Sequence, residues 1–555
     1  MNKRYCALLL VICLIFTGCS YKSSESVKEK DVKTDDAKLS PFGKYPELVT
    51  YTLGKMSGVN NSNMPEGDTY ENNAYTRYLK EKLNVQNKDV FEIEETGNYS
   101  ETVSMAIASD NMPDVFQVMD YNTLQMLVKN DLIEDLTESF EKCTTKRIKD
   151  IYNSYGDKML SDVTFDGKLM AFPGTNIDNG PSFLWLRKDW LDKLHLKEPE
   201  TIEDVCRIVK EFIKKDPGNN GKGETVGLAC NDNLTGGSGY SEQYQMDIIF
   251  AKYNAYPRRW IKNKDGEIVY GTVEPQVKKA LKKLRSMYEE GIIDNDFILR
   301  GDNNIINLVA EGKCGAFFGP WWSPNNPLMQ SKINQKEAEW VPYLIQTDKD
   351  GNTSFSTQNP SGYYIVVRKG YKHPEIVAKI ISVLFDDNRY DREEIAEYYQ
   401  DNVDPTARPL AVNVDFRDSL SRCYMLLCDA LEGKIGYNDL PILEGAYYKS
   451  CNRYENSSNP SVEDWAAYTS RIKACSLMDK SKLKSVESLF YGETESMKEH
   501  WWKLQELEKE TLLAIVTGDK PISYFDRFVD EWYESGGKKI TEEVEEYIEK
   551  RKPLK

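Results

Sequence analysis

Histidine is scarce in this chain, and the motifs that most often mark catalytic centres are missing. Only three of the 555 residues are histidines, His195, His373 and His500, and they lie far apart in the sequence. Zinc sites and Ser-His or Cys-His catalysis depend on imidazole, so this scarcity weakens the case for both. No GxxxxGK[ST] phosphate loop occurs, so the chain is not expected to hydrolyse nucleotides. Carboxylate chemistry stays open, because 89 residues are Asp or Glu.

Cysteine patterns that bind zinc or exchange disulfides are missing as well. None of the eleven cysteines forms a CxxC pair, which leaves zinc ribbons and thioredoxin-like sites unsupported. Cys206 and Cys314 lie within apolar patterns, and we interpret them as small core residues. Disulfides remain open, because spacing alone does not assign a pairing.

Long hydrophobic runs are missing except at the start of the chain. A basic beginning precedes a mostly apolar run from Tyr5 to Phe16. This run is shorter than the ~20 residues that cross a bilayer, so residues 1–18 are predicted to be a secretory signal peptide. The sequence Phe16-Thr17-Gly18-Cys19 resembles the lipobox of bacterial lipoproteins, although Phe16 stands where that family usually has leucine.

The lipobox resemblance implies that Cys19 begins the mature protein and carries lipid on its thiol and its new amino group. Acyl chains such as palmitate would hold the body at the extracellular face of the cell membrane, since each buried methylene contributes ~0.8 kcal/mol. An ordinary signal peptide with a chance Gly-Cys pair is the alternative. Residues 19–43 are predicted to be a flexible tether, because this segment is too rich in Ser, Lys, Glu and Asp to bury a core.

Length and charge restrict what the body can be. About 510 residues follow the tether, too many for a single hydrophobic core, so we expect two lobes or more. The net charge of −17 argues against nucleic acid and against anionic partners generally, because phosphates need a basic footprint. This charge suits a neutral or weakly charged ligand.

Apolar strand-like runs alternate with helix patterns, which is typical of α/β architecture. Strands are predicted at residues 49–53, 91–94, 114–119, 183–186 and 316–318. Helices are predicted at residues 73–83, after the N-cap Thr201, after Pro275, after Pro374, and through the acidic C-terminal region 501–549.

Several fragments resemble the carbohydrate-type extracellular solute-binding proteins, a maltose-binding-like family. They occur in the order that this family shows, at Asp110–Phe116, Leu132–Thr137, Phe165–Pro173, Arg187–Leu194, Glu311–Trp322 and Pro360–Val367. The tail from Gly518 to Val544 resembles a large lipoprotein branch of the family. Each fragment alone is weakly specific, but together they cover nearly all of the mature chain.

The resemblance implies a two-lobed α/β fold with hinge crossovers, in which a ligand between the lobes favours the closed state. Lobe 1 is expected to comprise residues 44–174 and 364–440, and lobe 2 residues 175–363 and 441–555. The crossings are expected near Pro173–Asn179, near Asn359–Tyr363 and after about residue 440.

Sugars present C–H faces and rings of hydroxyl groups, so we looked for aromatic platforms and planar polar side chains. In the maltose-binding family the tryptophan of a Gly-Pro-Trp motif stacks on sugar, and this role maps to Trp321. The other predicted ligand residues are Trp322, Asp120, Asn176, Asp178, Asn179 and Tyr363. Packing of both tryptophans at a lobe interface and capping of a helix by Asp120 are the alternatives. Trp185, Trp260 and Tyr364 are expected to pack rather than bind.

Residues 216–225 resemble the Asp/Asn-rich calcium loop of the large lipoprotein branch. Asp216, Asn220 and Glu224 occupy positions one, five and nine, and the carbonyl of Lys222 occupies position seven. Gly218 stands at position three, where the family has Asp or Asn, so one ligand is missing. A structural calcium ion and a plain polar turn are both open, and no cofactor is expected to be required.

The resemblance implies a lipid-anchored, monomeric receptor that captures an oligosaccharide and delivers it to the permease of an ABC importer. It is not expected to be an enzyme or to bind nucleic acid. A lipid-anchored glycan-degrading enzyme is an alternative, because acidic pairs cannot be ruled out by sequence. A surface adhesin or scaffold is another, and a peptide or other non-sugar ligand stays open because the fold does not fix the ligand.

Overall fold

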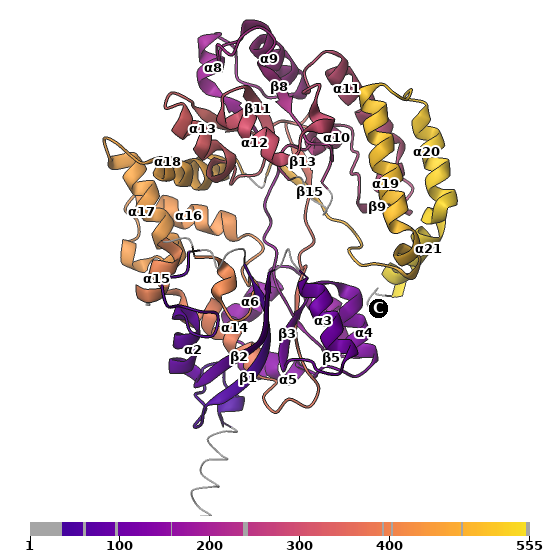
Figure 1. Ribbon diagram of the computed structural model, residues 1–555. Helices are drawn as coiled ribbons and strands as arrows, with labels where there is room; N and C mark the ends of the chain where they lie inside the picture. Colours follow the sequence, from indigo (N-terminus) through magenta and orange to yellow (C-terminus); the bar gives the residue numbers. More distant parts are fainter. Residues whose placement is uncertain are drawn as a thin grey trace, which may run out of the picture. The chain divides into compact units, whose positions relative to one another are not determined.

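The computed structural model describes residues 36–58, 63–94, 98–156, 158–236, 242–390, 393–400, 403–478 and 481–550. The predicted signal peptide and Cys19 lie outside these residues. The chain divides into two compact units, drawn in Figure 1. Unit 1 comprises residues up to Thr175 and from Tyr363 to Val414, and unit 2 the residues from Asn176 to Gly362 and from Asp415 onward. The chain therefore passes between the units three times.

Unit 1 is built on a five-stranded sheet in the order β2-β1-β3-β14-β6. β1 is parallel to β2 and β3, β14 is antiparallel to β3, and β6 is antiparallel to β14. The strands of this unit are β1 (Val49–Ser57), β2 (Val85–Glu94), β3 (Val115–Val118), β4 (Thr164–Phe165), β5 (Lys168–Leu169), β6 (Phe172–Pro173) and β14 (Tyr364–Val367). The predicted strand at 91–94 is only the end of β2. The first half of β2 was not predicted, because it contains polar residues, which an edge strand tolerates.

Helices pack against both sides of this sheet, as in other α/β folds. Asn73 forms a capping box with Thr76 at the start of α2, which confirms the helix predicted from residue 73. The helices are α2 (Ala74–Leu83), α3 (Tyr99–Ala108), α4 (Tyr121–Lys129), α5 (Thr137–Cys143), α6 (Lys146–Asn153), α7 (Lys158–Asp162), α14 (Ile376–Phe385) and α15 (Glu393–Gln400), with short 3-10 turns at 387–389 and 405–407.

The described end of the predicted tether is part of unit 1. Ala37 is buried, and the ammonium group of Lys379 donates hydrogen bonds to the carbonyl oxygens of Ala37 (2.7 Å) and Ser40 (2.5 Å). The thiol of Cys143 donates to the carbonyl oxygen of Lys38 at 2.9 Å. The predicted boundary at residue 43 was therefore wrong for residues 36–43, because backbone carbonyls can be held by a buried cation whatever the side chains are.

Unit 2 is built on a four-stranded sheet in the order β12-β7-β11-β8. Alternation along β7 places Leu184 and Leu186 in one hydrophobic cluster and Phe183 and Trp185 in another. The strands of this unit are β7 (Phe183–Arg187), β8 (Val226–Ala229), β9 (Trp260–Lys262), β10 (Ile268–Tyr270), β11 (Cys314–Gly319), β12 (Trp340–Tyr343), β13 (Thr353–Ser356) and β15 (Leu483–Val486). The mixed strands and helices of both units confirm the predicted α/β class.

Two helices of unit 2 begin where the sequence predicts them. Thr201 and Asp204 form a capping box at the start of α9, and Pro275 is the first residue of α11. The helices are α8 (Lys188–Lys193), α9 (Ile202–Lys215), α10 (Asp247–Lys252), α11 (Pro275–Glu289), α12 (Asp302–Ala310), α13 (Met329–Asn334), α16 (Ser419–Leu431), α17 (Ile442–Asn456), α18 (Val462–Tyr468), α19 (Glu495–Thr517), α20 (Tyr524–Trp532) and α21 (Lys538–Lys550). α19 packs on α11 and runs beside α20 (Figure 1).

The last boundary between the units lies between Val414 and Asp415, whereas the sequence analysis placed it near residue 440. α16 accounts for the difference, because it packs against α17 and against the π-helical turn Thr469–Ala474, both of unit 2. Its Leu420 joins the hydrophobic cluster around Trp185. Within the described residues, no helix combines the length and the apolar character needed to span a bilayer.

Candidate functional site

Unit 2 contains a pocket of about 250 Å³ that is the candidate ligand site. Asp178 and Gly180 line it from the segment that enters unit 2, and Asp418 and Ser421 line it from the start of α16. Phe355 of β13 contributes an aromatic ring. Carboxylate oxygens that accept hydrogen bonds, a hydroxyl group and a ring are the groups that a polyhydroxylated ligand needs.

Hydrogen bonds between backbone segments hold this wall of the pocket in place. The amide N–H of Asp178 donates to the carbonyl oxygen of Arg417 at 2.8 Å, and the N–H of Asn176 donates to that of Pro360 at 2.8 Å. The carboxylate of Asp178 accepts the N–H of Gly180 through Oδ1 at 3.0 Å. Its Oδ2 has no partner among the described residues, so it can accept from a ligand.

Asn176 has a structural contact that the sequence did not indicate. Its side-chain amide donates to the carbonyl oxygen of Asn359 at 2.9 Å. Both residues belong to segments of unit 2 that lie next to the crossings into unit 1. Its predicted role as a ligand residue stays a prediction, but the amide already links two of the connecting segments.

Trp321 lies in a stack of planar groups close to this pocket. Its indole N–H donates to Oδ1 of Asn179 at 3.4 Å, and Asn179 lies between the pocket residues Asp178 and Gly180. The guanidinium carbon of Arg471 lies 4.3 Å from the centre of the Trp321 ring and 4.0 Å from the centre of the Tyr447 ring.

The indole of Trp321 is only 7% exposed, because Arg471 and a hydrophobic cluster cover it. Trp322 is half-buried against the same cluster. The predicted sugar-stacking role of Trp321 stays a prediction, and the structure shows that Arg471 occupies a place beside its ring. Trp185 and Trp260 are buried, with the indole N–H of Trp185 donating to the carbonyl oxygen of Pro320 at 3.0 Å, which confirms that they pack.

Asp120 and Tyr363 lie in unit 1, apart in the chain from the unit 2 pocket. Asp120 is exposed and caps α4, and its two carboxylate oxygens accept the N–H of Thr123 at 2.8 Å and the hydroxyl of Thr123 at 2.7 Å. The capping alternative is therefore what the structure shows for this side chain. Tyr363 is half-buried beside the crossing at residues 362–363, and its neighbour Tyr364 is buried, as expected.

The predicted calcium loop closes on itself through hydrogen bonds. Asp216 accepts the N–H groups of Asn220 (3.0 Å) and Gly221 (2.9 Å) and the hydroxyl of Thr225 (2.6 Å). The donors around it lower the pKa of the Asp216 carboxyl, the largest effect coming from Thr225. The amide nitrogen of Asn220 donates to Thr225 and to the carbonyl oxygen of Gly312, both at 3.0 Å.

This loop fits calcium incompletely. Calcium takes six to eight oxygen ligands, while Asp216, Asn220, the Lys222 carbonyl and Glu224 provide only part of such a set. Within the described residues, no three His, Cys, Asp or Glu side chains gather as a metal site. The eight described cysteines are all unpaired. The calcium site stays a prediction, with the loop already supported by its own donors.

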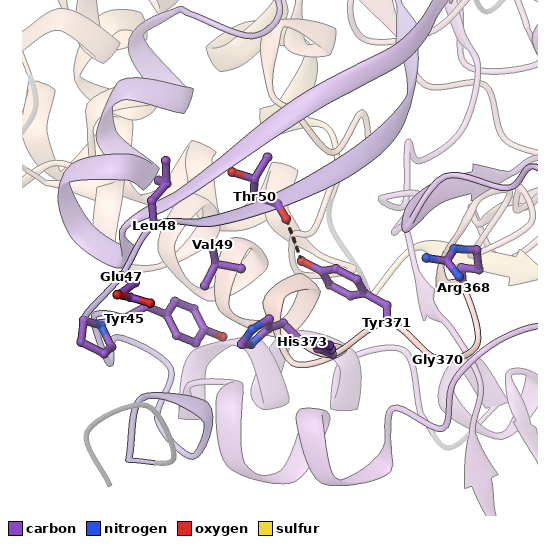
Figure 2. Close-up of a pocket in the computed structure, with 11 residues that line it drawn as sticks. Tyr45, Glu47, Leu48, Val49, Thr50, Arg368, Gly370, Tyr371 and His373 are labelled. Carbon is purple, nitrogen blue, oxygen red and sulfur yellow. Dashed lines mark hydrogen bonds between the residues drawn. The ribbon is translucent and has the colours of Figure 1, made fainter. Parts of the chain in front are cut away.

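A second pocket, of about 470 Å³, lies in unit 1 at the amino end of β1 (Figure 2). The hydroxyl of Tyr371 donates to the carbonyl oxygen of Thr50 at 3.4 Å, and Arg368 pairs with Asp114 at 2.6 Å. Tyr45 donates to Glu375 at 2.6 Å, and its ring meets His373 edge-on. Its described lining residues include none of the predicted ligand residues, and several of its polar groups already have partners, so the unit 2 pocket is the better candidate.

Sequence reasoning missed most of the residues that line the pocket, and it missed Arg471 beside Trp321. Phe355 and Asp418 lie in segments without a motif. Arg471 lies in the helical turn Thr469–Ala474, whose sequence shows no binding motif either. Only the fold brings these segments to one place, and no local pattern of the sequence signals them.

Comparison with known proteins agrees with this architecture. A family model described as bacterial extracellular solute-binding protein matches residues 61–387, more than half of the chain. The polygalacturonan/rhamnogalacturonan-binding protein YtcQ of Bacillus subtilis strain 168 is 22% identical over 480 residues, which are 81% of this chain and 83% of YtcQ. The fructooligosaccharide ABC transporter substrate-binding protein FusA of Streptococcus pneumoniae serotype 4 is 23% identical over 330 residues, which are 52% of this chain and 59% of FusA.

A solved structure shows the same fold. The S. pneumoniae FusA EF-hand mutant in complex with fructo-nystose aligns with a TM-score of 0.58 at 15% identity. The alignment covers 90% of this chain and 99% of the FusA chain. The two chains therefore share their fold over nearly their full lengths.

Proposed function

We propose that this chain, which belongs to the bacterial extracellular solute-binding protein family, captures an oligosaccharide and presents it to the permease of an ABC importer. The observation that carries the proposal is the pocket of unit 2, whose walls come from two of the three segments that connect the units. A ligand that contacts connecting segments can bias a hinge, because it binds one arrangement of the segments better than another.

The relatives support a carbohydrate ligand. YtcQ is named for polygalacturonan and rhamnogalacturonan, and FusA for fructooligosaccharides. The pocket offers Asp178, Asp418 and Ser421 as hydrogen-bonding partners and Phe355 as a ring. A binding role needs no cofactor, and calcium at residues 216–224 would serve structure only. We infer that the chain is not an enzyme, because its relatives are named for binding.

The lipobox resemblance supports the proposed location. Lipid on Cys19 would anchor a monomeric receptor to the membrane at its extracellular face, where an importer takes up its ligand. Radiolabelled palmitate should join the chain in cells, and Cys19→Ala should abolish the label. Release of the unlabelled variant into the medium would accompany this result.

Thermal melting against a glycan panel tests the proposed function. The panel contains fructooligosaccharides, maltodextrins, oligogalacturonates and neutral galacto-oligosaccharides, with a peptide pool as the non-sugar arm. A ligand at a hundred times its Kd should add about 2.7 kcal/mol to the free energy of unfolding. Stabilisation by peptides alone would contradict the sugar assignment. Release of new reducing ends from a glycan would show an enzyme instead.

Asp178→Asn provides a matched test of the pocket. It keeps the size of the side chain and can still accept through one oxygen, so binding should weaken by roughly tenfold rather than vanish. Asp192→Asn, on the exposed surface of α8, is the control and should leave affinity unchanged. Equal affinities for the wild type and Asp178→Asn would remove this pocket from the site.

A further inference from the structure

Arg471 is held in a fixed orientation by two aromatic rings. It lies in the π-helical turn Thr469–Ala474 and is half-buried. Its guanidinium lies over Trp321 at 4.3 Å and over Tyr447 at 4.0 Å. A guanidinium stacked in this way loses little further freedom when its edge forms hydrogen bonds.

The N–H groups of this guanidinium have no acceptor among the described residues. Arg471 donates no hydrogen bond and forms no ion pair with any part of the chain that the structure describes. The titratable groups nearest to the guanidinium are the phenol of Tyr447 and the thiols of Cys423, Cys451 and Cys475. Burial raises the pKa of these three thiols, so they are neutral at physiological pH and do not balance the charge.

Several other arginines of unit 2 have carboxylate partners, although the buried Arg259 has none among the described residues and its Nη1 donates to the carbonyl oxygen of Arg258. Arg258 pairs with Glu508, Arg300 with Asp294, Arg453 with Asp464 and Arg187 with Asp189. A cation that has lost part of its hydration is costly to leave unpaired. A ligand would supply the carboxylate partner that Arg471 lacks among the described residues.

We propose that Arg471 is a ligand-binding residue that receives a carboxylate group of an acidic oligosaccharide. The stack fixes the plane of the guanidinium, and a carboxylate matches its two parallel N–H groups. Trp321 links Arg471 to Asn179, the neighbour of the pocket residues Asp178 and Gly180. This inference rests on the proposed function and narrows it to sugars that carry uronic acids.

The acidic character of the whole chain does not oppose this assignment. Charges separated by more than a Debye length of about 8 Å are screened at physiological ionic strength. The nearby guanidinium therefore affects the binding of a carboxylate more than the distant acidic residues do. The net charge of −17 slows the approach of an anion more than it weakens the contact itself. The sequence-based expectation of a neutral ligand considered only the sum of charges.

Calorimetry with two matched sugars tests the assignment on the full chain. The probes are an α-1,4-linked trigalacturonate and the neutral trisaccharide in which each carboxylate is reduced to a hydroxymethyl group. The wild type should bind the acidic probe at least about tenfold more tightly, and this preference should fall as salt rises. Arg471→Met should lose about 10- to 100-fold affinity for the acidic probe and less than about threefold for the neutral one.

Two further variants complete the test. Arg471→Lys keeps the positive charge but lacks the two parallel N–H groups of a guanidinium. Its affinity for the acidic probe should therefore lie between those of the wild type and Arg471→Met. Arg207→Met removes an exposed arginine from α9 and should change neither affinity. If Arg471→Met does not fold, the salt dependence of the wild type and the Arg471→Lys result still decide the question.

The possible failures are distinguishable. Binding of the neutral probe with equal or greater affinity by the wild type would overturn the role of Arg471 and leave the proposed function intact. Preference for a phosphorylated sugar over both probes would overturn the carboxylate assignment. Absence of stabilisation by every glycan of the panel would overturn the proposed function and this inference together.

Discussion

In unit 1 the buried ammonium group of Lys55 donates to three backbone carbonyls, whereas in unit 2 the guanidinium of Arg471 donates to no group that the structure describes. Lys55 bonds to the carbonyl oxygens of Met56 (2.6 Å), Thr406 (2.5 Å) and Arg408 (2.9 Å). The ammonium group of Lys379 likewise donates to the carbonyl oxygens of Ala37 and Ser40. A cation whose donors are all used supports the fold, and one whose donors are unused is available to a ligand.

The largest effect is expected for Trp321→Ala, which removes one of the two rings that hold Arg471. Trp321 is buried in a hydrophobic cluster, so the substitution should cost about 3–5 kcal/mol of unfolding free energy in urea titrations. Affinity for the captured sugar should also fall by roughly 1–3 kcal/mol, because the stack around Arg471 is lost. Unchanged calorimetric affinity in the folded variant would remove Trp321 from the site.

Lys55→Met should destabilise unit 1 by about 3 kcal/mol, because three carbonyl oxygens lose their shared donor in the interior. Two of these carbonyls belong to the segment 406–408, which precedes the crossing at Val414. Urea titration measures the effect, and Lys88→Met on the exposed surface of β2 is the control. A loss no larger than that of the control would contradict the structural role of Lys55.

Lys379→Met should release the segment 36–43 and cost about 2 kcal/mol, since two carbonyl oxygens lose one donor. Cleavage by trypsin at Lys38 or Lys44 should become faster, which mass spectrometry of early fragments detects. Lys372→Met, which is exposed nearby, should leave the cleavage rate unchanged. Equal rates in Lys379→Met and the wild type would mean that other contacts hold this segment.

Asp216→Ala extends the comparison to an anion. The carboxylate oxygens of Asp216 already accept hydrogen bonds from within their own loop. The loop loses three hydrogen bonds to one carboxylate, so the variant should be destabilised by about 1–2 kcal/mol. A calcium chelator should shift the melting temperature of the wild type by less than this substitution does, because the loop closes through its own donors. A larger shift with the chelator would show that calcium is the main support.

The smallest effect is expected for Arg471→Met on stability. No described hydrogen bond or ion pair is lost, so the free energy of unfolding should change by less than about 1 kcal/mol. The same substitution should strongly reduce binding of the acidic probe. A loss of stability as large as that of Lys55→Met would assign Arg471 to the fold and end the contrast between the two cations.

Local signals in the sequence predicted much of the fold. α2 and α9 follow the N-caps Asn73 and Thr201, and α11 begins at Pro275, because caps and Pro at a first helical position act through neighbouring residues. The first half of β2 was missed, since its edge position tolerates polar residues. The boundary near residue 440 was misplaced because α16 packs on unit 2, and packing partners are not written in the segment itself.

The candidate site was predicted only in part for the same reason. Asp178 follows the first crossing, and the family resemblance pointed to its segment. Asp120 has the right residue type, but its carboxylate caps α4. Arg471 follows Trp321 by 150 residues, and nothing in either segment indicates that their side chains stack.

The sequence by itself determined the α/β class, the principal helices and the family, because these depend on periodicity, caps and ordered motifs along the chain. Tertiary structure alone decided that residues 36–43 join unit 1, that α16 belongs to unit 2 and that Arg471 stacks on two rings without a hydrogen-bond acceptor among the described residues. Those outcomes depend on which distant groups share a low-dielectric environment, where a cation must find oxygen acceptors or remain available to a ligand.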